Sequence, residues 1–268
     1  MTRVTEKRFI VHGKGCDINC KLILPKTQKN AKLPLLIMCH GFGANISRPN
    51  HINISNELIK QGVATLMFDF YGHGSSSGKF EDVTAEKELQ NLEDVYSFVM
   101  NYSDGKSNKL FEFVDKKRIA IYGSSFVGMI TLIFASHHPE LRLIILKAPV
   151  SDFILQWSDK KGFNEWKVKN KVYDHNNKLV KLKYEFFEKG SAFDVYKLAE
   201  KIICPVYVIH GTGDESVTIK QSEELMRHLN NSAEKQLKII EGADHRFTNH
   251  KHNKEMVEWI VEKIRRNV

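Results

Sequence analysis

The stretch RIAIYGSSFVGMITLIF, residues 118–134, decides the fold class of this 268-residue chain. It begins with a short apolar run, passes through a glycine–serine turn at residues 123–125, and continues as a longer apolar run. A buried strand that leads directly into a buried helix is the building unit of parallel α/β sheets. Ser125 would then lie beyond the carboxyl end of a strand, where such sheets bind their ligands.

Apolar runs bounded by turn residues alternate with amphipathic stretches on both sides of this segment. We expect strands at residues 8–12, 16–24, 34–40, 64–70, 118–122, 141–147, 206–210 and 237–240. We expect helices at residues 50–61, 85–101, 125–137, 219–229 and 254–266. The first two strands are joined by Gly13-Lys14-Gly15, which favours a tight hairpin. The pattern predicts an α/β fold with a mostly parallel central sheet of about eight strands and flanking helices.

The length fits a single domain over residues 1–268, and 42% hydrophobic with 27% charged residues is an ordinary globular composition. The alternation of strands and helices lapses over residues 150–203, which are rich in lysine and aromatic side chains. A structureless loop of this length is uncommon in a compact domain. We therefore expect an insertion that lies over the sheet.

Composition also excludes several classes of protein. No apolar run approaches the roughly 20 residues needed to cross a bilayer, and residues 1–9 carry charges without the apolar core of a secretory signal. We therefore expect a cytoplasmic protein with no integral membrane segment. The four cysteines lie in or beside apolar runs at a spacing that suits no zinc site, so we expect buried free thiols and no metal. They are Cys16, Cys20, Cys39 and Cys204.

The net charge of +8 is concentrated in one segment. Residues 160–183 hold eight lysines against Glu165 and Asp174. Such a run is either a solvated face or a patch that attracts an anionic ligand, and both interpretations remain open. No RNA-binding signature, zinc finger or long basic helix accompanies the run, so nucleic acid is not an expected partner.

Polar residues follow four of the predicted strands, at residues 40–43, 123–128, 210–214 and 242–245. Together they supply a hydroxyl, a carboxylate and an imidazole in the chain order Ser125, Asp214, His245, which is the order of an α/β-hydrolase triad. A serine hydroxyl needs a base within hydrogen-bond reach, and the base needs a group that orients it. The sequence therefore predicts Ser125 as nucleophile, His245 as base and Asp214 as the orienting acid.

Two other serines compete with Ser125 for the role of nucleophile. The literal G-x-S-x-G motif is centred on Ser76, but it lies in a polar loop without the flanking strand and helix that a nucleophile elbow requires. Ser124 would leave Tyr122 where the first small residue should be. At Ser125 the second glycine of the motif is replaced by Val127, so we expect a slightly shifted turn in which Gly128 relieves part of the crowding.

The orienting acid and the oxyanion donors are assigned by position. Glu215 and Asp244 compete with Asp214, but Asp214 ends the loop after a strand, whereas Asp244 adjoins the base and would reach its Nδ1 only with difficulty. The developing oxyanion needs N–H donors, and we expect them from the backbone of Phe42 and Phe126. We expect His40 to order its loop, and the polar residues 69–74 to form a structural turn.

With these segments in place, the chain resembles the serine α/β-hydrolases, most closely the bacterial cinnamoyl and feruloyl esterase-like group. The resemblance spans nearly the whole chain. It rests on the opening hairpin and on HGFG (40–43), FDFYGHGS (68–75), GKFED (78–82), HGTGDE (210–215) and EGADHRF (241–247). It implies an α/β-hydrolase fold in which residues 150–203 form a small lid over the acyl pocket. The apolar residues of this lid either line that pocket or pack the lid on the body: Phe153, Ile154, Leu155, Trp157, Phe163 and Trp166.

We therefore expect a serine hydrolase that cleaves carboxylic esters, of small acyl or hydroxycinnamoyl type, through an acyl-enzyme. The alternatives are a lipase or monoacylglycerol-type enzyme, a thioesterase, a peptidase-like hydrolase, or a catalytically impaired binding module of the same fold. The mechanism requires no cofactor and no metal. The expected partner is a small-molecule ester, and a homodimer is left open.

Overall fold

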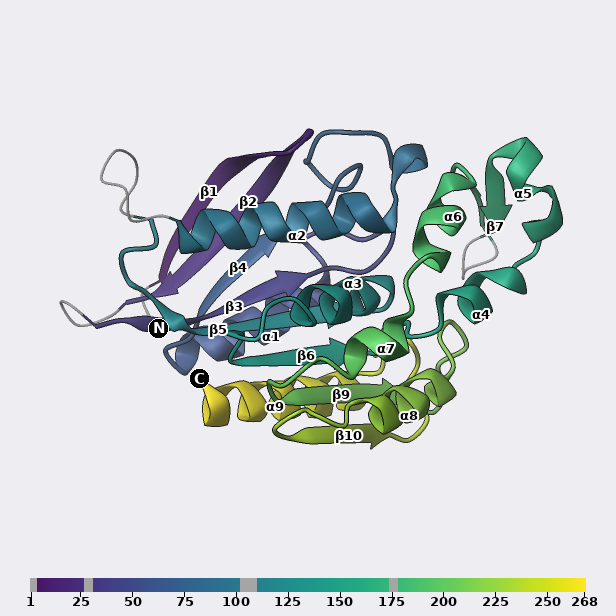
Figure 1. Cartoon of the computed structure of the whole chain (residues 1–268). Helices are drawn as coiled ribbons and strands as arrows, with labels where there is room; N and C mark the ends of the chain where they lie inside the picture. The colour runs from purple at the N-terminus through teal and green to yellow at the C-terminus, as the bar shows by residue number, and fades with distance from the viewer. Residues whose placement is uncertain (1–3, 27–30, 102–109, 174–177) are drawn as a thin grey trace.

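The computed structural model describes residues 4–26, 31–101, 110–173 and 178–268, and its centre is one eight-stranded sheet (Figure 1). In spatial order the strands are β1 (Val4–Gly13), β2 (Cys16–Pro25), β4 (Ala64–Phe68), β3 (Leu33–Cys39), β5 (Val114–Ser124), β6 (Leu143–Lys147), β9 (Val206–Gly211) and β10 (Lys235–Ile240). Strand β2 pairs antiparallel with both of its neighbours, and every pair from β4 to β10 is parallel. The predicted mostly parallel sheet of about eight strands is confirmed.

Two helical layers cover the two faces of the sheet. On one face lie α2 (Ala85–Met100), α3 (Phe126–Ala135) and α8 (Ile219–His228), and on the other lie α1 (Pro49–Lys60) and α9 (His250–Asn267). Strand β3 shows why its sequence is apolar throughout: Leu35 faces the α2 and α3 core, and Leu36 faces the α1 and α9 core. A strand buried on both faces has no polar side to show in its sequence.

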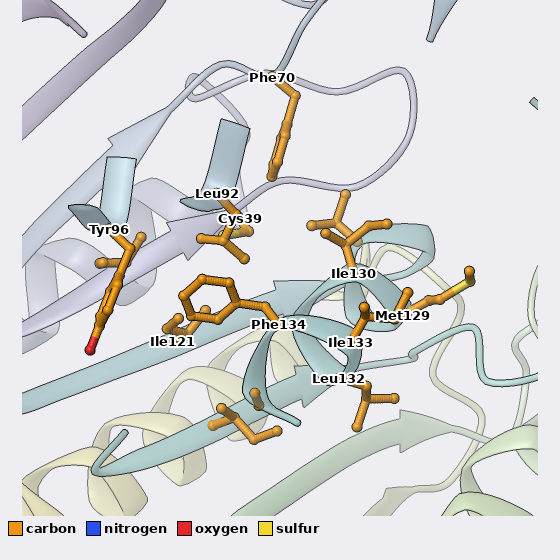
Figure 2. Packing of buried hydrophobic residues seen from close by; sticks show 14 of the residues in the cluster. Cys39, Phe70, Leu92, Tyr96, Ile121, Met129, Ile130, Leu132, Ile133 and Phe134 are labelled. Carbon is orange, nitrogen blue, oxygen red and sulfur yellow. The ribbon is translucent and has the colours of Figure 1, made fainter. Parts of the chain in front are cut away.

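Helix α3 is buried along its whole length, because every residue from Phe126 to Ala135 is inaccessible to solvent or nearly so. Figure 2 shows Ile130, Ile133 and Phe134 of α3 packed between the sheet and α2. Burying one such side chain stabilises the fold by about 1.5–3 kcal/mol. The helix that follows Ser125 is thus held by packing between the sheet and α2.

The described residues of the insertion, 150–173 and 178–203, form short elements, most of which lie beyond the carboxyl edge of the sheet, whereas α7 (Val195–Ala199) packs against α3 and α8 (Figure 1). The elements before α7 are α4 (Phe153–Ser158), α5 (Phe163–Lys169), β7 (Lys171–Tyr173), β8 (Leu179–Lys181) and α6 (Glu185–Ser191). Strands β7 and β8 pair only with each other, in a two-stranded antiparallel sheet. A 3-10 turn, η1 (Phe80–Asp82), lies upstream of α2. None of these elements was expected individually from the sequence.

Three predicted boundaries were wrong by about four residues. Strand β1 begins at Val4 rather than at residue 8. Strand β5 begins at Val114 rather than at residue 118, and α9 begins at His250 rather than at residue 254. The side chain of Asn249 accepts hydrogen bonds from the N–H groups of Lys251 and His252, so it caps α9 one turn earlier than the apolar pattern indicated.

Two sequence predictions concern the chain as a whole. The four cysteines are free and buried, as expected. Within the described ranges, no helix combines the length and the apolar character that crossing a bilayer requires. Residues 1–3, which belong to the segment considered as a signal, and Asp174 of the basic run lie outside the described residues.

Candidate active site

Ser125 occupies a sharp turn between β5 and α3. Its backbone has φ 58° and ψ −129°, a conformation that non-glycine residues rarely adopt. The N–H of Ser125 donates to the carbonyl of Lys147 at the end of β6, at 2.9 Å. The turn therefore lifts the Ser125 side chain above the carboxyl edge of the sheet, as a nucleophile elbow requires.

The close approaches at this turn fall on glycines 123 and 128. A Cβ at Gly123 would lie 2.2 Å from Oγ1 of Thr131, and a Cβ at Gly128 would lie 2.6 Å from Cβ of Pro149. Val127 points instead into the hydrophobic core and is completely buried. The valine is thus accommodated, because the neighbouring chain comes closest to α3 one residue later.

Replacing Val127 by glycine is therefore expected to weaken the fold without raising turnover. Loss of the buried side chain and a glycine in a helix should together lower the free energy of unfolding by about 3 kcal/mol. Urea unfolding measures this loss, and Val127→Ala separates the side-chain effect from the backbone effect. A tenfold rise in kcat of Val127→Gly would contradict the expectation and mean that the valine distorts the turn.

The structure brings the three residues of the predicted triad together. Nε2 of His245 lies 3.0 Å from Oγ of Ser125, and Nδ1 of His245 lies 2.7 Å from Oδ2 of Asp214. Oδ1 of Asp214 accepts from the N–H groups of Ser216 and Val217. Burial alone would raise the pKa of Asp214, but its hydrogen bonds with His210 and His245 hold that pKa well below its usual value. Asp214 is therefore ionised where it meets the imidazole.

His210 is a residue of this site that the sequence did not single out. It is fully buried at the end of β9, and its Nε2 lies 3.1 Å from Oδ2 of Asp214 and 2.9 Å from the carbonyl oxygen of Val217. Both of these atoms are acceptors, so Nε2 carries the hydrogen and Nδ1 accepts from the hydroxyl of Ser222. His210 thus fixes the carboxylate oxygen that faces His245. Its signal in the sequence was a histidine at the end of an apolar strand.

The competing acids and serine have other partners. The carboxylate of Asp244 accepts from the N–H and the hydroxyl of Thr248, and so holds the turn before α9. Glu215 is exposed. Ser76 accepts from the N–H of Asn19 and donates to the carbonyl of Asp69, which makes it part of a structural loop.

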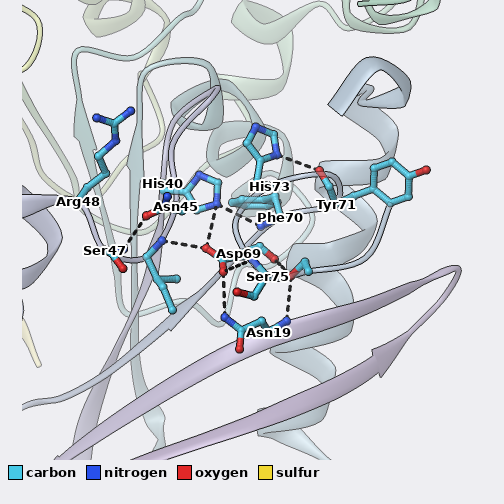
Figure 3. A network of polar contacts seen from close by, with 12 residues as sticks. Asn19, His40, Asn45, Ser47, Arg48, Asp69, Phe70, Tyr71, His73 and Ser75 are labelled. Atoms are coloured by element: carbon cyan, nitrogen blue, oxygen red, sulfur yellow. Dashed lines mark hydrogen bonds and ion pairs between the residues drawn. The ribbon is translucent and has the colours of Figure 1, made fainter. Parts of the chain in front are cut away.

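A polar network behind the loop after β3 holds that loop in place (Figure 3). His40 accepts from the N–H of Phe70 through Nε2, and His73 accepts from the N–H of Gly43 through Nε2. The other ring nitrogen, Nδ1, of each histidine contacts a backbone carbonyl, so both rings are neutral. Burial lowers the pKa of both histidines, which agrees with this pattern. His40 therefore orders its loop, as expected.

Asp69 is the centre of the same network in Figure 3. Its buried carboxylate accepts from the N–H groups of Ile46 and Ser75 and from the side chain of Asn19, each at 2.9 Å. These bonds join the segments after β3 and β4 to β2. The polar residues after β4 thus form a structural turn.

The loop after β3 also comes close to the nucleophile. A Cβ at Gly41 would lie 3.2 Å from Cβ of Ser125. The N–H of Phe42 makes no hydrogen bond within the part of the chain that the structure describes. The N–H of Phe126 starts α3, where a helix has no internal acceptor for it. Both N–H groups are thus available to a ligand atom.

A family model described as the prolyl oligopeptidase family matches residues 51–266. The chain belongs to the prolyl oligopeptidase family. It is therefore an α/β-hydrolase of the serine hydrolase type, and the predicted membership of the serine α/β-hydrolases is confirmed.

Individual relatives of this family member are distant. The quorum-quenching protein AidA of Acinetobacter baumannii is 26% identical over 152 residues, which cover 57% of this chain and 47% of AidA. This chain thus spans about half the length of that relative. The monoglyceride lipase homolog of monkeypox virus is 22% identical over 92% of both chains.

The solved structures support the same fold. Est1E from Butyrivibrio proteoclasticus, in its structure with ferulic acid bound, has a TM-score of 0.77 at 24% identity and covers 96% of each chain. Mouse α/β hydrolase domain-containing protein 10 has a TM-score of 0.72 at 18% identity, over 97% of this chain and 99% of that one. At these identities the likeness establishes the fold alone.

Two spaces of very different size adjoin Ser125 in this prolyl oligopeptidase family member. One is a void of about 20 Å³, whose lining includes Phe126, Trp157 and Val217. The other is a cavity of about 760 Å³ on the α1 and α9 side of the sheet. Its lining includes Phe42, Tyr122, Ser125, Lys147 and His245. The second space is large enough for a small-molecule ligand.

Aromatic residues fill most of the region on the insertion side of Ser125. Phe42, Phe126, Phe153, Trp157 and Phe186 form an aromatic block, in which neighbouring ring centroids lie 5.0–6.3 Å apart. The structure therefore favours the packing interpretation for Phe153 and Trp157. Trp166 is also fully buried, whereas Ile154 and Leu155 are exposed.

The basic run over residues 160–183 is largely a solvated face. Lys181 and Lys183 pair with Glu81 and Asp82 near η1, and Lys169 pairs with Glu165 in its own helix. Of the eight lysines of the run, all in described positions, Lys178 is the one that lines the 760 Å³ cavity.

Proposed function

We propose that this chain is a serine hydrolase of carboxylic esters that works through an acyl-enzyme. The observation that carries the proposal is the hydrogen-bonded series Ser125, His245, Asp214 at a strained turn beside two available N–H groups. These are the parts that acyl transfer needs: a nucleophile with its base, an orienting carboxylate and donors for the oxyanion.

In the proposed mechanism, Nε2 of His245 takes the hydroxyl proton as Oγ of Ser125 attacks the ester carbonyl. The carbonyl oxygen becomes negative and accepts hydrogen bonds from the N–H groups of Phe42 and Phe126. The C–O bond to the alcohol then breaks, and His245 returns the proton to the leaving oxygen. A water molecule, deprotonated by the same nitrogen, releases the acid and restores Ser125.

The insertion over residues 150–203 is, in this proposal, a lid on the single hydrolase domain. Its aromatic block closes one side of Ser125 and leaves the larger cavity as the way in. Excluding water in this way strengthens the hydrogen bonds that act on the oxyanion.

Peptidase activity is the second candidate, because the family model is that of prolyl oligopeptidases. Against it, no Asp or Glu is among the described residues that line the 760 Å³ cavity, so the cavity offers no carboxylate for the amino terminus of a peptide. We expect turnover of p-nitrophenyl butyrate and no measurable turnover of a dipeptidyl prolyl p-nitroanilide. Release of p-nitrophenol and p-nitroaniline, followed by absorbance, measures both. Efficient cleavage of the anilide alone would replace the esterase proposal by the peptidase one.

A further inference from the structure

The 760 Å³ cavity beside Ser125 has an unbalanced charge. Four cationic side chains line it, namely Arg48, Lys147, Lys178 and Arg246. Its described lining contains no acidic side chain. A concave site lined by one sign of charge focuses the potential and attracts ligands of the opposite sign.

Lys147 is the unusual member of this set because it is buried, with 4% of its surface exposed. Its Nζ donates to the carbonyl of His245 at 2.6 Å and lies 5.5 Å from the centre of the Phe247 ring. No carboxylate of the described residues lies within 4 Å of this ammonium group. Buried lysines are rare unless they are paired, and an ammonium has three hydrogens to donate.

The charged groups around Lys147 also favour an anion beside its ammonium group. Burial, together with the nearby charges of Arg246 and Arg48, lowers its pKa to about 8, against the opposing influence of Asp214 and Asp244. The two carboxylates are already engaged, Asp214 with the histidines and Asp244 with Thr248. An anion in the cavity would relieve the repulsion among the three cations.

Two helices begin at the same cavity. Pro49 starts α1 and His250 starts α9, both residues line the cavity, and neither helix has an acidic residue in its first turn. The N–H groups at a helix start carry partial positive charge and favour an anion. In α9 the N–H groups of Lys251 and His252 already donate to Asn249, whereas the start of α1 has no side-chain cap.

Two buried polar side chains also lie in the wall of this cavity. His51 is 4% exposed and Tyr122 is completely buried, and both line the cavity. Neither ring nitrogen of His51, nor the hydroxyl of Tyr122, makes a hydrogen bond of good geometry among the described residues. The backbone of Cys39 and the side chain of Ser124 are nevertheless close enough to influence the pKa values of His51 and Tyr122 respectively. These polar groups add hydrogen-bonding capacity to the wall of the cavity.

We propose that this cavity binds an oxyanion, a carboxylate or a phosphate, on the substrate whose ester bond lies at Ser125, with Lys147 as the central cation. The proposal rests on the proposed esterase function, whose substrate class it narrows to anionic esters. The void of about 20 Å³ on the other side of Ser125 has no room for such a group, so the anionic part occupies the larger cavity.

The test compares two esters that differ only in a terminal carboxylate: mono-p-nitrophenyl adipate and p-nitrophenyl hexanoate. We expect kcat/KM to favour the adipate by at least tenfold, and Lys147→Met to lower this ratio by tenfold or more. Lys171→Met, which removes an exposed lysine that does not line the cavity, should leave the ratio unchanged. Arg48→Gln should also lower this ratio, and it replaces Lys147→Met in the test if that variant does not fold. Adipate and butyl phosphate as inhibitors of hexanoate hydrolysis then tell whether the site takes a carboxylate or a phosphate.

A second readout does not depend on turnover. Adipate or butyl phosphate should raise the Tm of Ser125→Ala, and the additional change Lys147→Met should abolish that rise. If the hexanoate is hydrolysed but the ratio stays near one in all variants, the anion site is wrong and the esterase proposal stands. If no ester is hydrolysed, the esterase proposal fails, and the Tm shift alone decides whether the cavity binds an anion.

Discussion

Ser125→Ala is expected to lower kcat/KM for p-nitrophenyl butyrate by roughly 10⁴- to 10⁶-fold, the range seen when the nucleophile of a serine protease triad is removed. The reason is chemical: without Oγ no acyl-enzyme forms, and only binding and oxyanion stabilisation remain. The same variant should lose all labelling by a fluorophosphonate, which the wild-type protein should carry on the peptide that contains Ser125. Initial rates and peptide mass mapping measure the two effects.

Ser76→Ala is the matched control, because Ser76 is the centre of the literal G-x-S-x-G segment. It removes two loop hydrogen bonds, so it should lower the Tm slightly while the label remains on Ser125. Labelling of Ser125→Ala, or labelling of Ser76 in the wild-type protein, would contradict the assignment of Ser125 as the nucleophile. Absence of any label and any turnover would favour the binding-module alternative.

Asp214→Asn is expected to lower kcat by roughly 10³- to 10⁴-fold with a small change in KM, by analogy with the acid of protease triads. A neutral amide cannot stabilise the imidazolium of His245 as a carboxylate does. His210 donates to the same oxygen that faces His245, so the asparagine oxygen is held there and its NH₂ group faces the N–H groups of Ser216 and Val217, which lose their acceptor. Steady-state kinetics separates the kcat effect from the KM effect.

The control for this variant is Glu215→Gln, at the neighbouring exposed acid. Its kcat should stay within about twofold of the wild-type value, since surface substitutions away from special features have small effects. A large loss in Glu215→Gln with an active Asp214→Asn would reverse the assignment of the acid. A loss in Asp214→Asn that follows a collapse of Tm would show a structural role instead.

The centre of the sheet could be predicted from the sequence because its central strands are buried on both faces. Residues 33–39 contain no polar side chain, and a strand between two helical layers requires this. The elbow was predictable for the same reason: α3 is apolar on all sides, and the polar turn before it stands out. Ser125, Asp214 and His245 follow such strands directly, so their meeting at one edge follows from the parallel order.

The insertion and the cavity could not be predicted in this way. The elements of residues 150–203 are only three to seven residues long, and their aromatic side chains take their partners from distant segments such as Phe42. Lys147 is the last residue of an apolar run, and a lysine at that position predicts a strand end that faces solvent. Only the tertiary structure shows that the ends of α1 and α9 close over it. His210 was missed for a similar reason, since its partners Val217 and Ser222 belong to the next loop and helix.

The complete burial of α3 sets the order of events when the chain folds. A ten-residue helix that is apolar all round is only marginally stable by itself in water, and the strained backbone of Ser125 persists only where packing holds it. If Ser125 is the proposed nucleophile, it becomes reactive only after the sheet and α2 have packed on α3. In a refolding experiment, the rate at which a fluorophosphonate labels Ser125 would measure when this packing is complete. A compact intermediate with native helix content but without this packing would not be labelled.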